Sequence, residues 1–332
     1  MNSKEKLVTN GMLIITALLW GSALSFRKMA LEYMNAFFFN GARFFVSFIV
    51  IFSAYLISEK LKSGKSQRLP AHPDGNPSAG PGQGLPAHPE LKPISWQIKS
   101  GILIGTFFNL GSSFQQLGLL TSEAGRGGFI STLYIFFIPL ISRVVLGKRI
   151  SAKIWLGCSV AVVGLFFISM GNDFNIILGD VFFLITAVFY AIQVILIGRC
   201  VIHSNPLFLV SIQLATCAVM SMLLAALFER GNTPEGLILA MFPILYTGVL
   251  SLGVANLLQF IAQKKANPSV AGLIMSLESV FGAGFAAVLL HERMNPLQLS
   301  GCGLIFLAIL ISQVEKRKTN RQTLRPAAME RD

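Results

Sequence analysis

Charged side chains are scarce in this chain of 332 residues, because Asp, Glu, Lys and Arg make up only 13% of it. An ordinary soluble domain has about 25%. Hydrophobic residues account for 53%, and the few charges fall in short groups between long apolar runs. Since a soluble protein covers much of its surface with charged residues, this shortage excludes an ordinary soluble domain. We expect lipid to surround most of the chain.

Acidic residues are fewer than basic ones, 15 against 27, which leaves a net charge of +12. No basic stretch is interleaved with aromatic residues, as a surface that stacks nucleotides requires, so we expect no nucleic-acid partner. The basic residues fall between the apolar runs instead. Such an excess of Lys and Arg is typical of cytoplasmic loops in membrane proteins.

Cysteine and histidine are also few, with four of each. The cysteines lie in or beside apolar runs, without the close spacing of a metal site, at Cys158, Cys200, Cys217 and Cys302. We expect them to pack as small hydrophobic residues. His72 and His88 share a duplicated pentapeptide, Leu-Pro-Ala-His-Pro, but the other ligands that a zinc ion needs are missing. The sequence predicts no metal site and no cofactor.

Ten apolar runs are each long enough to cross a bilayer as a helix, which takes about 20 residues. They lie at 8–26, 36–57, 98–119, 126–146, 154–171, 178–198, 206–228, 239–262, 268–290 and 297–314. The basic start of the chain resembles a signal peptide, but Trp20 and Arg27 make a poor cleavage region, so we expect the first run to remain as a helix. The predicted fold is an all-α integral membrane protein with ten transmembrane helices.

The segment between the second and third runs, residues 58–97, is polar and rich in Pro, Gly and Ser. Such a segment cannot bury enough apolar surface to order itself, so a flexible cytoplasmic insert is predicted. It separates helices 1 and 2, in residues 1–57, from helices 3 to 5, in residues 98–171. A second half with helices 6 to 10 occupies residues 178–314, and a basic cytoplasmic tail follows at 315–332.

The Lys and Arg residues fall mainly on one side of the predicted bundle. With the N-terminus inside the cell, 20 of the 27 lie on the cytoplasmic side and 5, among them Arg27 and Lys28, lie on the outer side. Arg43 and Arg143 lie within spans. Because short cytoplasmic loops retain positive charge, we expect both termini in the cytoplasm and the protein in the inner, cytoplasmic membrane.

An internal repeat relates the two halves. A shift of 144 residues places the fourth and fifth runs on the ninth and tenth, and pairs Gly128 with Gly272. A shift of 170 residues aligns the first run with the sixth. Because each half has an odd number of spans, the second half enters the membrane upside down. Two inverted five-helix repeats are typical of secondary transporters, although an old duplication with a non-transport role would leave the same pattern.

Several short segments carry a family resemblance. They are Trp20-Gly21-Ser22, Gly41-Ala42-Arg43-Phe44, Gly128 to Tyr134 with Pro139, Ser276-Leu277-Glu278-Ser279, and His291-Glu292-Arg293. In this order and spacing they resemble the drug/metabolite transporter superfamily and, within it, the EamA-type ten-helix permeases. Ser279 stands where such proteins often have Pro. The resemblance implies a permease that moves small metabolites, amino acids or drugs across the cytoplasmic membrane.

Two charged residues lie deep in spans, Arg43 in the second and Glu278 near the middle of the ninth. A charge at the bilayer centre costs about 2.5–3.5 kcal/mol on insertion scales, so each is a functional candidate. Glu278 would take up a proton or face a cationic substrate, and Arg43 would attract an anionic group. The alternative is that each is neutralised by a partner and only fixes helix packing.

Uncharged polar residues repeat at helical spacing in two spans. They are Asn109, Ser112, Ser113 and Gln116, with Gln115 beside them, in the third span, and Asn256, Gln259 and Gln263 in the eighth. The shift of 144 residues pairs Ser112 with Asn256 and Gln115 with Gln259. A cavity lined by both stripes is the leading candidate site. Hydrogen bonds between helices are the alternative role.

Three aromatic residues complete the candidate site, because Trp20, Tyr134 and Tyr190 combine a ring with a polar tip. This combination suits a cavity for amphipathic solutes, although it also anchors helices at membrane interfaces. The candidate substrate-binding residues are Trp20, Asn40, Arg43, Asn109, Ser112, Gln115, Gln116, Tyr134, Tyr190, Asn256, Gln259 and Glu278, with Glu278 as the candidate for proton coupling.

The spans offer little for catalysis, because they contain no histidine and only one central carboxylate. The sequence also lacks a Gly-rich phosphate loop followed by Lys and Ser or Thr, which excludes ATP-driven transport. We therefore expect no enzyme but a secondary transporter that works by alternating access. Its partners would be a small-molecule substrate and the lipid bilayer, and a homodimer is left open. A membrane channel or sensor without carrier activity is the alternative.

Overall fold

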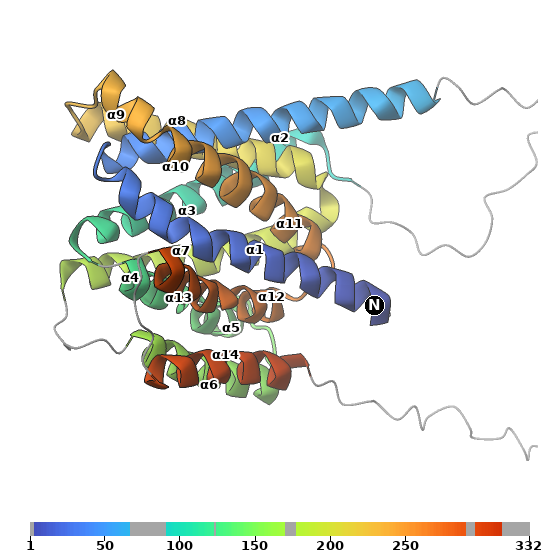
Figure 1. The fold of residues 1–332 in the computed structure, drawn as a ribbon. Helices are drawn as coiled ribbons and strands as arrows, with labels where there is room; N and C mark the ends of the chain where they lie inside the picture. Colours follow the sequence, from blue (N-terminus) through green and yellow to red (C-terminus); the bar gives the residue numbers. More distant parts are fainter. Residues whose placement is uncertain (1–2, 67–90, 123, 170–176, 290–295, 314–332) are drawn as a thin grey trace, which may run out of the picture.

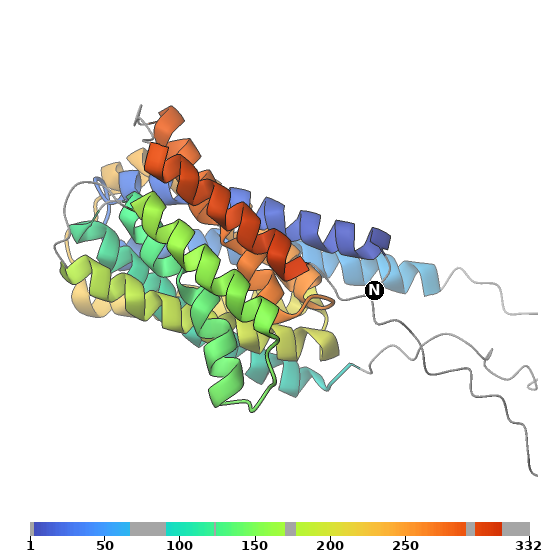
Figure 2. The ribbon, with the colours of Figure 1, turned by 90° about the horizontal axis from the view of Figure 1, so that it is seen from below.

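The computed structural model describes residues 3–66, 91–122, 124–169, 177–289 and 296–313. Within these ranges the chain forms helices and no strands. Most of the long helices run side by side, roughly parallel or antiparallel, and the connections gather at the two ends of the bundle (Figure 1). The same arrangement is visible after a quarter turn (Figure 2).

The helices follow one another along the chain with short connections. The N-terminal part contains α1 (Ser3–Ala30), α2 (Ala36–Ser66), α3 (Ile94–Thr121), α4 (Ala124–Thr132), α5 (Tyr134–Val144) and α6 (Ala152–Ser169). The C-terminal part contains α7 (Leu178–Cys200), the 3-10 helix η1 (Val201–His203), α8 (Pro206–Phe228), α9 (Pro234–Leu239), α10 (Met241–Leu245), the π-helix η2 (Tyr246–Val254), α11 (Ala255–Gln263), α12 (Pro268–Met275), α13 (Leu277–Leu289) and α14 (Pro296–Gln313).

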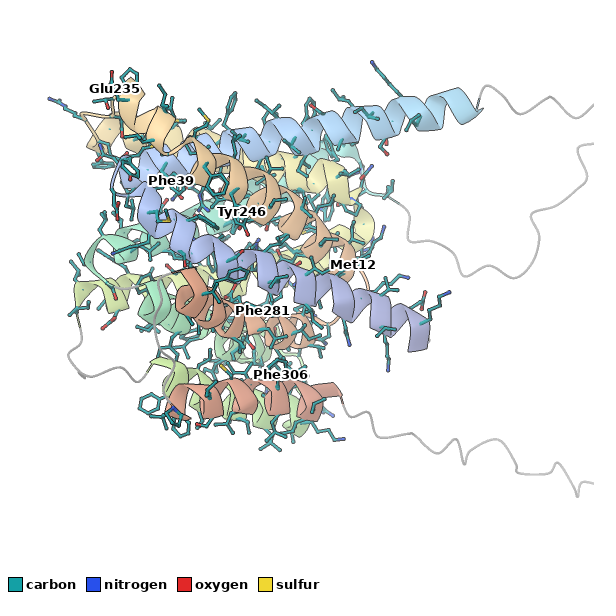
Figure 3. The ribbon with its side chains drawn as sticks, viewed as in Figure 1. Met12, Phe39, Glu235, Tyr246, Phe281 and Phe306 are labelled. Atoms are coloured by element: carbon teal, nitrogen blue, oxygen red, sulfur yellow. The ribbon has the colours of Figure 1, made fainter. Side chains whose placement is uncertain are left out.

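Seven helical segments in the described part of the chain are long and apolar enough to cross a membrane. They are α1, α2, the α4–α5 pair, α7, α8, the stretch from α10 to α11, and the α12–α13 pair. Shorter apolar stretches lie in α6 and α14. Apolar side chains face outward, such as that of Phe306 on α14 (Figure 3), which is 50% exposed. The chain is an all-α membrane protein.

The helices pack in pairs across the bundle. Helix α6 packs against α14, α2 against α8, and α3 against both α7 and α8. Helix α1 lies in the middle and contacts α13, α11 and η2. The approach of α1 to α13 is close because Gly21 has no side chain: a Cβ atom there would lie 2.8 Å from the backbone nitrogen of Gly282.

The predicted fourth and ninth spans are each two helices rather than one. The first break lies at Leu133, whose N–H donates to the carbonyl of Ile130 at 3.1 Å. Pro139 follows on α5, where it lacks an N–H and crowds the preceding turn. The second break lies at Ser276, whose hydroxyl donates to the carbonyl of Leu273 at 2.6 Å and so competes with the helical backbone bonds.

The predicted flexible insert is helical at both of its ends. Helix α2 continues to Ser66, and α3 already begins at Ile94. Hydropathy marks only the apolar part of a helix, whereas the Glu and Lys residues that follow in α2 are good helix formers in water. Residues 67–90, which include His72 and His88, lie outside the described residues, as does the predicted basic tail.

Candidate ligand cavity

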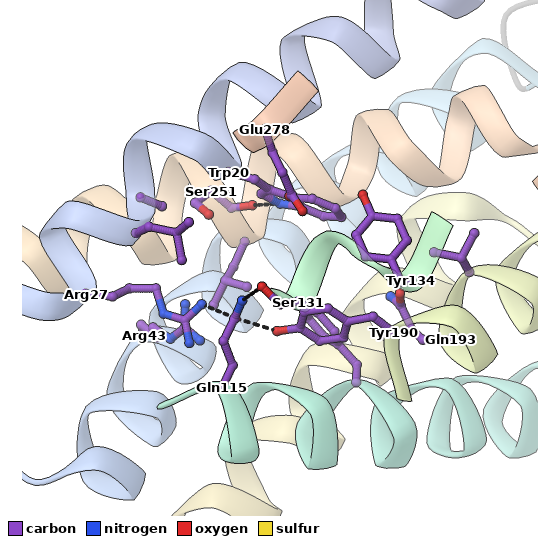
Figure 4. Close-up of a pocket in the computed structure, with 15 residues that line it drawn as sticks. Trp20, Arg27, Arg43, Gln115, Ser131, Tyr134, Tyr190, Gln193, Ser251 and Glu278 are labelled. Carbon is purple, nitrogen blue, oxygen red and sulfur yellow. Dashed lines mark hydrogen bonds between the residues drawn. The ribbon is translucent and has the colours of Figure 1, made fainter. Parts of the chain in front are cut away.

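Helices from both parts of the chain enclose a cavity of about 600 Å³, counting the space that is open to solvent. The cavity is lined by Trp20, Ala23, Leu24, Arg27, Arg43, Phe108, Gln115, Ser131, Tyr134, Tyr190, Gln193, Val194, Ser251, Leu252 and Glu278 (Figure 4). These residues come from α1, α2, α3, α4, α5, α7, η2 and α13.

Helix α1 contributes Trp20 and Arg27, which are two helical turns apart and therefore lie on one face. Arg27 was predicted in an outer loop, but α1 continues to Ala30, and only 6% of the Arg27 surface is exposed. Helix α7 contributes Tyr190 and Gln193, one turn apart. One face of each helix thus forms a wall of the cavity.

Arg27 is held by two consecutive glutamines of α3. Its Nε and Nη2 donate to Oε1 of Gln116 at 3.1 and 2.8 Å, and its Nη1 donates to Oε1 of Gln115. The same Gln115 oxygen accepts from the Tyr190 hydroxyl at 2.8 Å, and Gln115 Nε2 donates to Ser131 Oγ at 3.1 Å. Helices α1, α3, α4 and α7 are therefore joined by one hydrogen-bonded network.

Arg43 is held in a similar way from α2. Its Nε donates to Oδ1 of Asn40 at 2.9 Å, and its Nη2 donates to Oγ of Ser112 at 2.6 Å. Its guanidinium carbon lies 5.6 and 5.1 Å from the ring centres of Phe39 and Phe44, within the range of cation–π attraction. Only 2% of its surface is exposed. These contacts fix a buried cation beside the cavity.

Glu278 lies on α13 just after the break at Ser276. Its Oε1 accepts from the Thr132 hydroxyl at 2.9 Å, and the same hydroxyl is 2.9 Å from that of Ser279. The two helix breaks thus meet at the carboxylate. Tyr134 is also buried, and its hydroxyl has no hydrogen-bond partner among the described residues. In Figure 4 this hydroxyl lies on the same side of the cavity as Glu278.

Trp20 closes one wall of the cavity. Its Nε1 donates to the backbone carbonyl of Ser251 at 3.0 Å. Ser251 belongs to the π-helix η2. The bond fixes the indole ring in the wall of the cavity (Figure 4).

The structure brings six of the predicted binding residues together around the cavity, namely Trp20, Arg43, Gln115, Tyr134, Tyr190 and Glu278. Three more contact an arginine of the cavity: Asn40 and Ser112 bind Arg43, and Gln116 binds Arg27. Asn109 turns away to α8, where its Nδ2 donates to the carbonyl of Cys217 at 3.1 Å.

Asn256 and Gln259, also predicted as binding residues, are buried on α11 and do not line the cavity. The amide atoms of Gln259 and Gln263 have no hydrogen-bond partners within the described ranges, and neither does Oδ1 of Asn256. Helix α11 ends near the start of the chain, where Lys265 binds Glu5 at 2.9 Å. The cavity is thus lined by the polar stripe of α3, while the stripe of α11 is packed near the N-terminal end of the bundle.

Sequence reasoning missed four polar lining residues, Arg27, Ser131, Gln193 and Ser251. Helical spacing could have found three of them, because Arg27 shares a face with Trp20, Ser131 with Tyr134, and Gln193 with Tyr190. Ser251 contributes its backbone carbonyl, for which no sequence signal exists. Among the residues that the structure describes, no group of three or more His, Cys, Asp and Glu side chains is placed to hold a metal ion.

A family model and two relatives of known sequence are described as transporters. A family model described as the EamA-like transporter family matches residues 177–313. An uncharacterized transporter of Archaeoglobus fulgidus is 30% identical over 303 residues, covering 90% of this chain and 83% of that protein. The uncharacterized transporter YoaV of Bacillus subtilis is 20% identical over 309 residues, covering 90% and 94% of the two chains. A solved structure described as "Crystal structure of protein" shares the fold, with a TM-score of 0.68, 17% identity and coverage of 94% and 97%.

Proposed function

This chain belongs to the EamA-like transporter family and is a multi-pass membrane transporter, and we propose that it is a secondary transporter for a small metabolite, amino acid or drug in the cytoplasmic membrane. The main support for this proposal is the cavity. It gathers two arginines and a carboxylate among membrane-spanning helices. Ionisable groups in such a place mark solute pathways.

The proposed architecture has ten spans in two five-helix halves of opposite orientation, with the second half beginning at α7. Two observations support it. A shift of 144 residues brings the breaks at Leu133 and Ser276 within one position of each other. Helix α2 also packs against α8, and α6 against α14, and these are the helices that the repeat would make equivalent.

The proposed mechanism is alternating access, in which the two halves rock around the cavity. Near the N-terminal end of the bundle, α11 buries the amides of Gln259 and Gln263 without partners. Leaving a buried polar group unpaired costs about 1–3 kcal/mol, and water would satisfy these groups if this end opened. We propose that they line the path to the N-terminal side, which the charge pattern predicts to be cytoplasmic.

Counterflow in proteoliposomes tests this function. The purified protein is first screened by thermal shift against metabolite, amino-acid and drug libraries, because a ligand that binds the folded state raises its melting temperature. The bound compound is then loaded into vesicles, and uptake of its labelled form is followed. We expect saturable uptake that is accelerated by unlabelled compound inside. Unsaturable flux would indicate a channel, and absence of flux would indicate a sensor.

A matched pair of tryptophan variants links transport to the cavity. Trp20→Phe keeps a ring but loses the bond to the Ser251 carbonyl, so we expect weaker ligand binding and slower counterflow. Trp155→Phe is the control, since Trp155 lies on α6 beside Phe136 and does not line the cavity. Equal effects of the two variants would count against the cavity as the transport site.

A further inference from the structure

The cavity holds more positive than negative charge. Two guanidinium groups, those of Arg27 and Arg43, face it together with one carboxylate, that of Glu278. In the described part of the chain, every hydrogen-bond acceptor of the two arginines is an amide or hydroxyl oxygen, and none is a carboxylate. A buried charge without a counter-ion is strongly unfavourable. An anionic group in the cavity would remove this imbalance.

Both arginines also have guanidinium N–H groups that are not used by the neighbouring side chains. Nη1 of Arg43 donates to no acceptor within the described residues, while Asn40 and Ser112 hold the other two nitrogens of that guanidinium. Arg27 uses one N–H of each terminal nitrogen for a glutamine, which leaves the other for a ligand. A planar guanidinium with its orientation fixed and free N–H groups matches the two oxygens of a carboxylate.

We infer that the transported solute carries a carboxylate, which binds at Arg27 and Arg43. Across the cavity, the Tyr134 hydroxyl and the Glu278 carboxylate lie on the same side (Figure 4), and Thr132 donates to one of the two carboxylate oxygens. These groups would accept a hydroxyl or amino group at the other end of the solute. The inference rests on the proposed transport function and narrows it to organic acids and amino acids.

Binding of matched compounds to the wild-type protein tests the inference. Hexanoate, hexanamide, 2-aminohexanoate and hexylamine share one carbon chain and differ in charge, and the corresponding propanoate and nonanoate series vary the length. Binding is measured in detergent by calorimetry and thermal shift. We expect a carboxylate to bind at least about tenfold more tightly than its amide or amine. An amide or amine that binds as well as the acid, or a failure of every carboxylate to bind, would overturn the inference.

Comparing hexanoate with 2-aminohexanoate shows whether the solute is an organic acid or an amino acid. Tighter binding of 2-aminohexanoate than of hexanoate would identify amino acids, with the ammonium group facing Glu278. Tighter binding of hexanoate would identify organic acids. Both outcomes support the carboxylate site.

Arginine variants locate the carboxylate. Arg43→Gln should weaken binding of the acid about 10- to 100-fold and leave binding of the amide unchanged, while Arg43→Lys should restore part of the affinity. Arg143→Gln is the control, because Arg143 is exposed near the end of α5. Wild-type acid binding by a folded Arg43→Gln protein would overturn the assignment. If that variant does not fold, Arg27→Gln and the contrast between acid and amide in the wild type decide the question.

The failure of the inference and the failure of the transport function give different results. A carboxylate that binds in detergent but shows no counterflow in proteoliposomes would reject transport and leave the acid site in place. Counterflow of a solute without a carboxylate, unchanged in Arg43→Gln, would reject the acid site and leave transport in place.

Discussion

Replacing Gln259 by methionine should stabilise this conformation and slow transport. Gln259 is fully buried, and neither of its amide atoms has a hydrogen-bond partner among the described residues. An unpaired buried polar group costs about 1–3 kcal/mol, whereas methionine has a similar length and no amide. The substitution should therefore favour this conformation by about 2 kcal/mol, or roughly 30-fold, over one in which residue 259 faces water.

Gln97 provides the matched control, because its amide is satisfied. Its Nε2 donates to the carbonyl of Lys92 at 2.8 Å, and its Oε1 accepts from the backbone N–H of Asn205 at 3.2 Å. Gln97→Met should lower the melting temperature in detergent, whereas Gln259→Met should raise it and slow counterflow by roughly tenfold or more. A Gln259→Met protein that is less stable than the wild type, or that transports at the wild-type rate, would refute the reasoning.

Two further predictions concern α13. Gly21→Ala would press a Cβ atom against the backbone of Glu278 and Gly282, which should cost about 1–3 kcal/mol and lower the melting temperature. Gly11→Ala is the control, because a Cβ atom at Gly11 meets nothing within 4 Å. Equal shifts in the two alanine variants would contradict the close contact of α1 with α13. If Glu278 carries a coupled proton, Glu278→Gln should abolish the response of transport to an imposed proton gradient. Glu235→Gln, on the exposed surface of α9, is the control and should retain this response. A wild-type response in Glu278→Gln would exclude Glu278 as the proton site.

Hydropathy predicted the helices well, because a lipid environment requires backbone N–H and C=O groups to pair within their own helix. It could not predict where each helix ends, since polar residues can continue a helix beyond the lipid. The continuation of α1 to Ala30 matters most, because it moves Arg27 from a predicted loop into the cavity. Pro139 signals an irregular fourth span, because it cannot donate to the carbonyl of Ile135, but it lies six residues after the break at Leu133. The break at Ser276 has no comparable sequence signal. It is accompanied by a tertiary contact, between the hydroxyls of Ser279 and Thr132, which the sequence of one helix does not reveal.

Helical spacing predicted which polar side chains share a face of α3, but not which neighbour each of them meets. Asn109 binds α8, Gln116 binds Arg27 on α1, and Gln115 lines the cavity. These outcomes depend on how neighbouring helices pack, and a single helix pattern holds no information about that. The carbonyl of Ser251 is a stronger case, since every residue has such a group and the sequence does not indicate which one accepts from Trp20.

Gln115 and Gln259 are paired by the shift of 144 residues, yet their surroundings differ. Gln115 binds Arg27, Ser131 and Tyr190 beside the cavity, whereas the amide of Gln259 is buried without a partner. The shift of 144 residues also pairs Ser131, a partner of Gln115, with Met275, so the proposed repeat does not give the two glutamines the same surroundings. In the alternating-access mechanism that we propose, opening one end of the bundle would close the other, and Gln259 would meet water in the opposite conformation. The unfavourable burial of Gln259 would then raise the free energy of this conformation and keep it close to that of the opposite one, which a transporter must also reach.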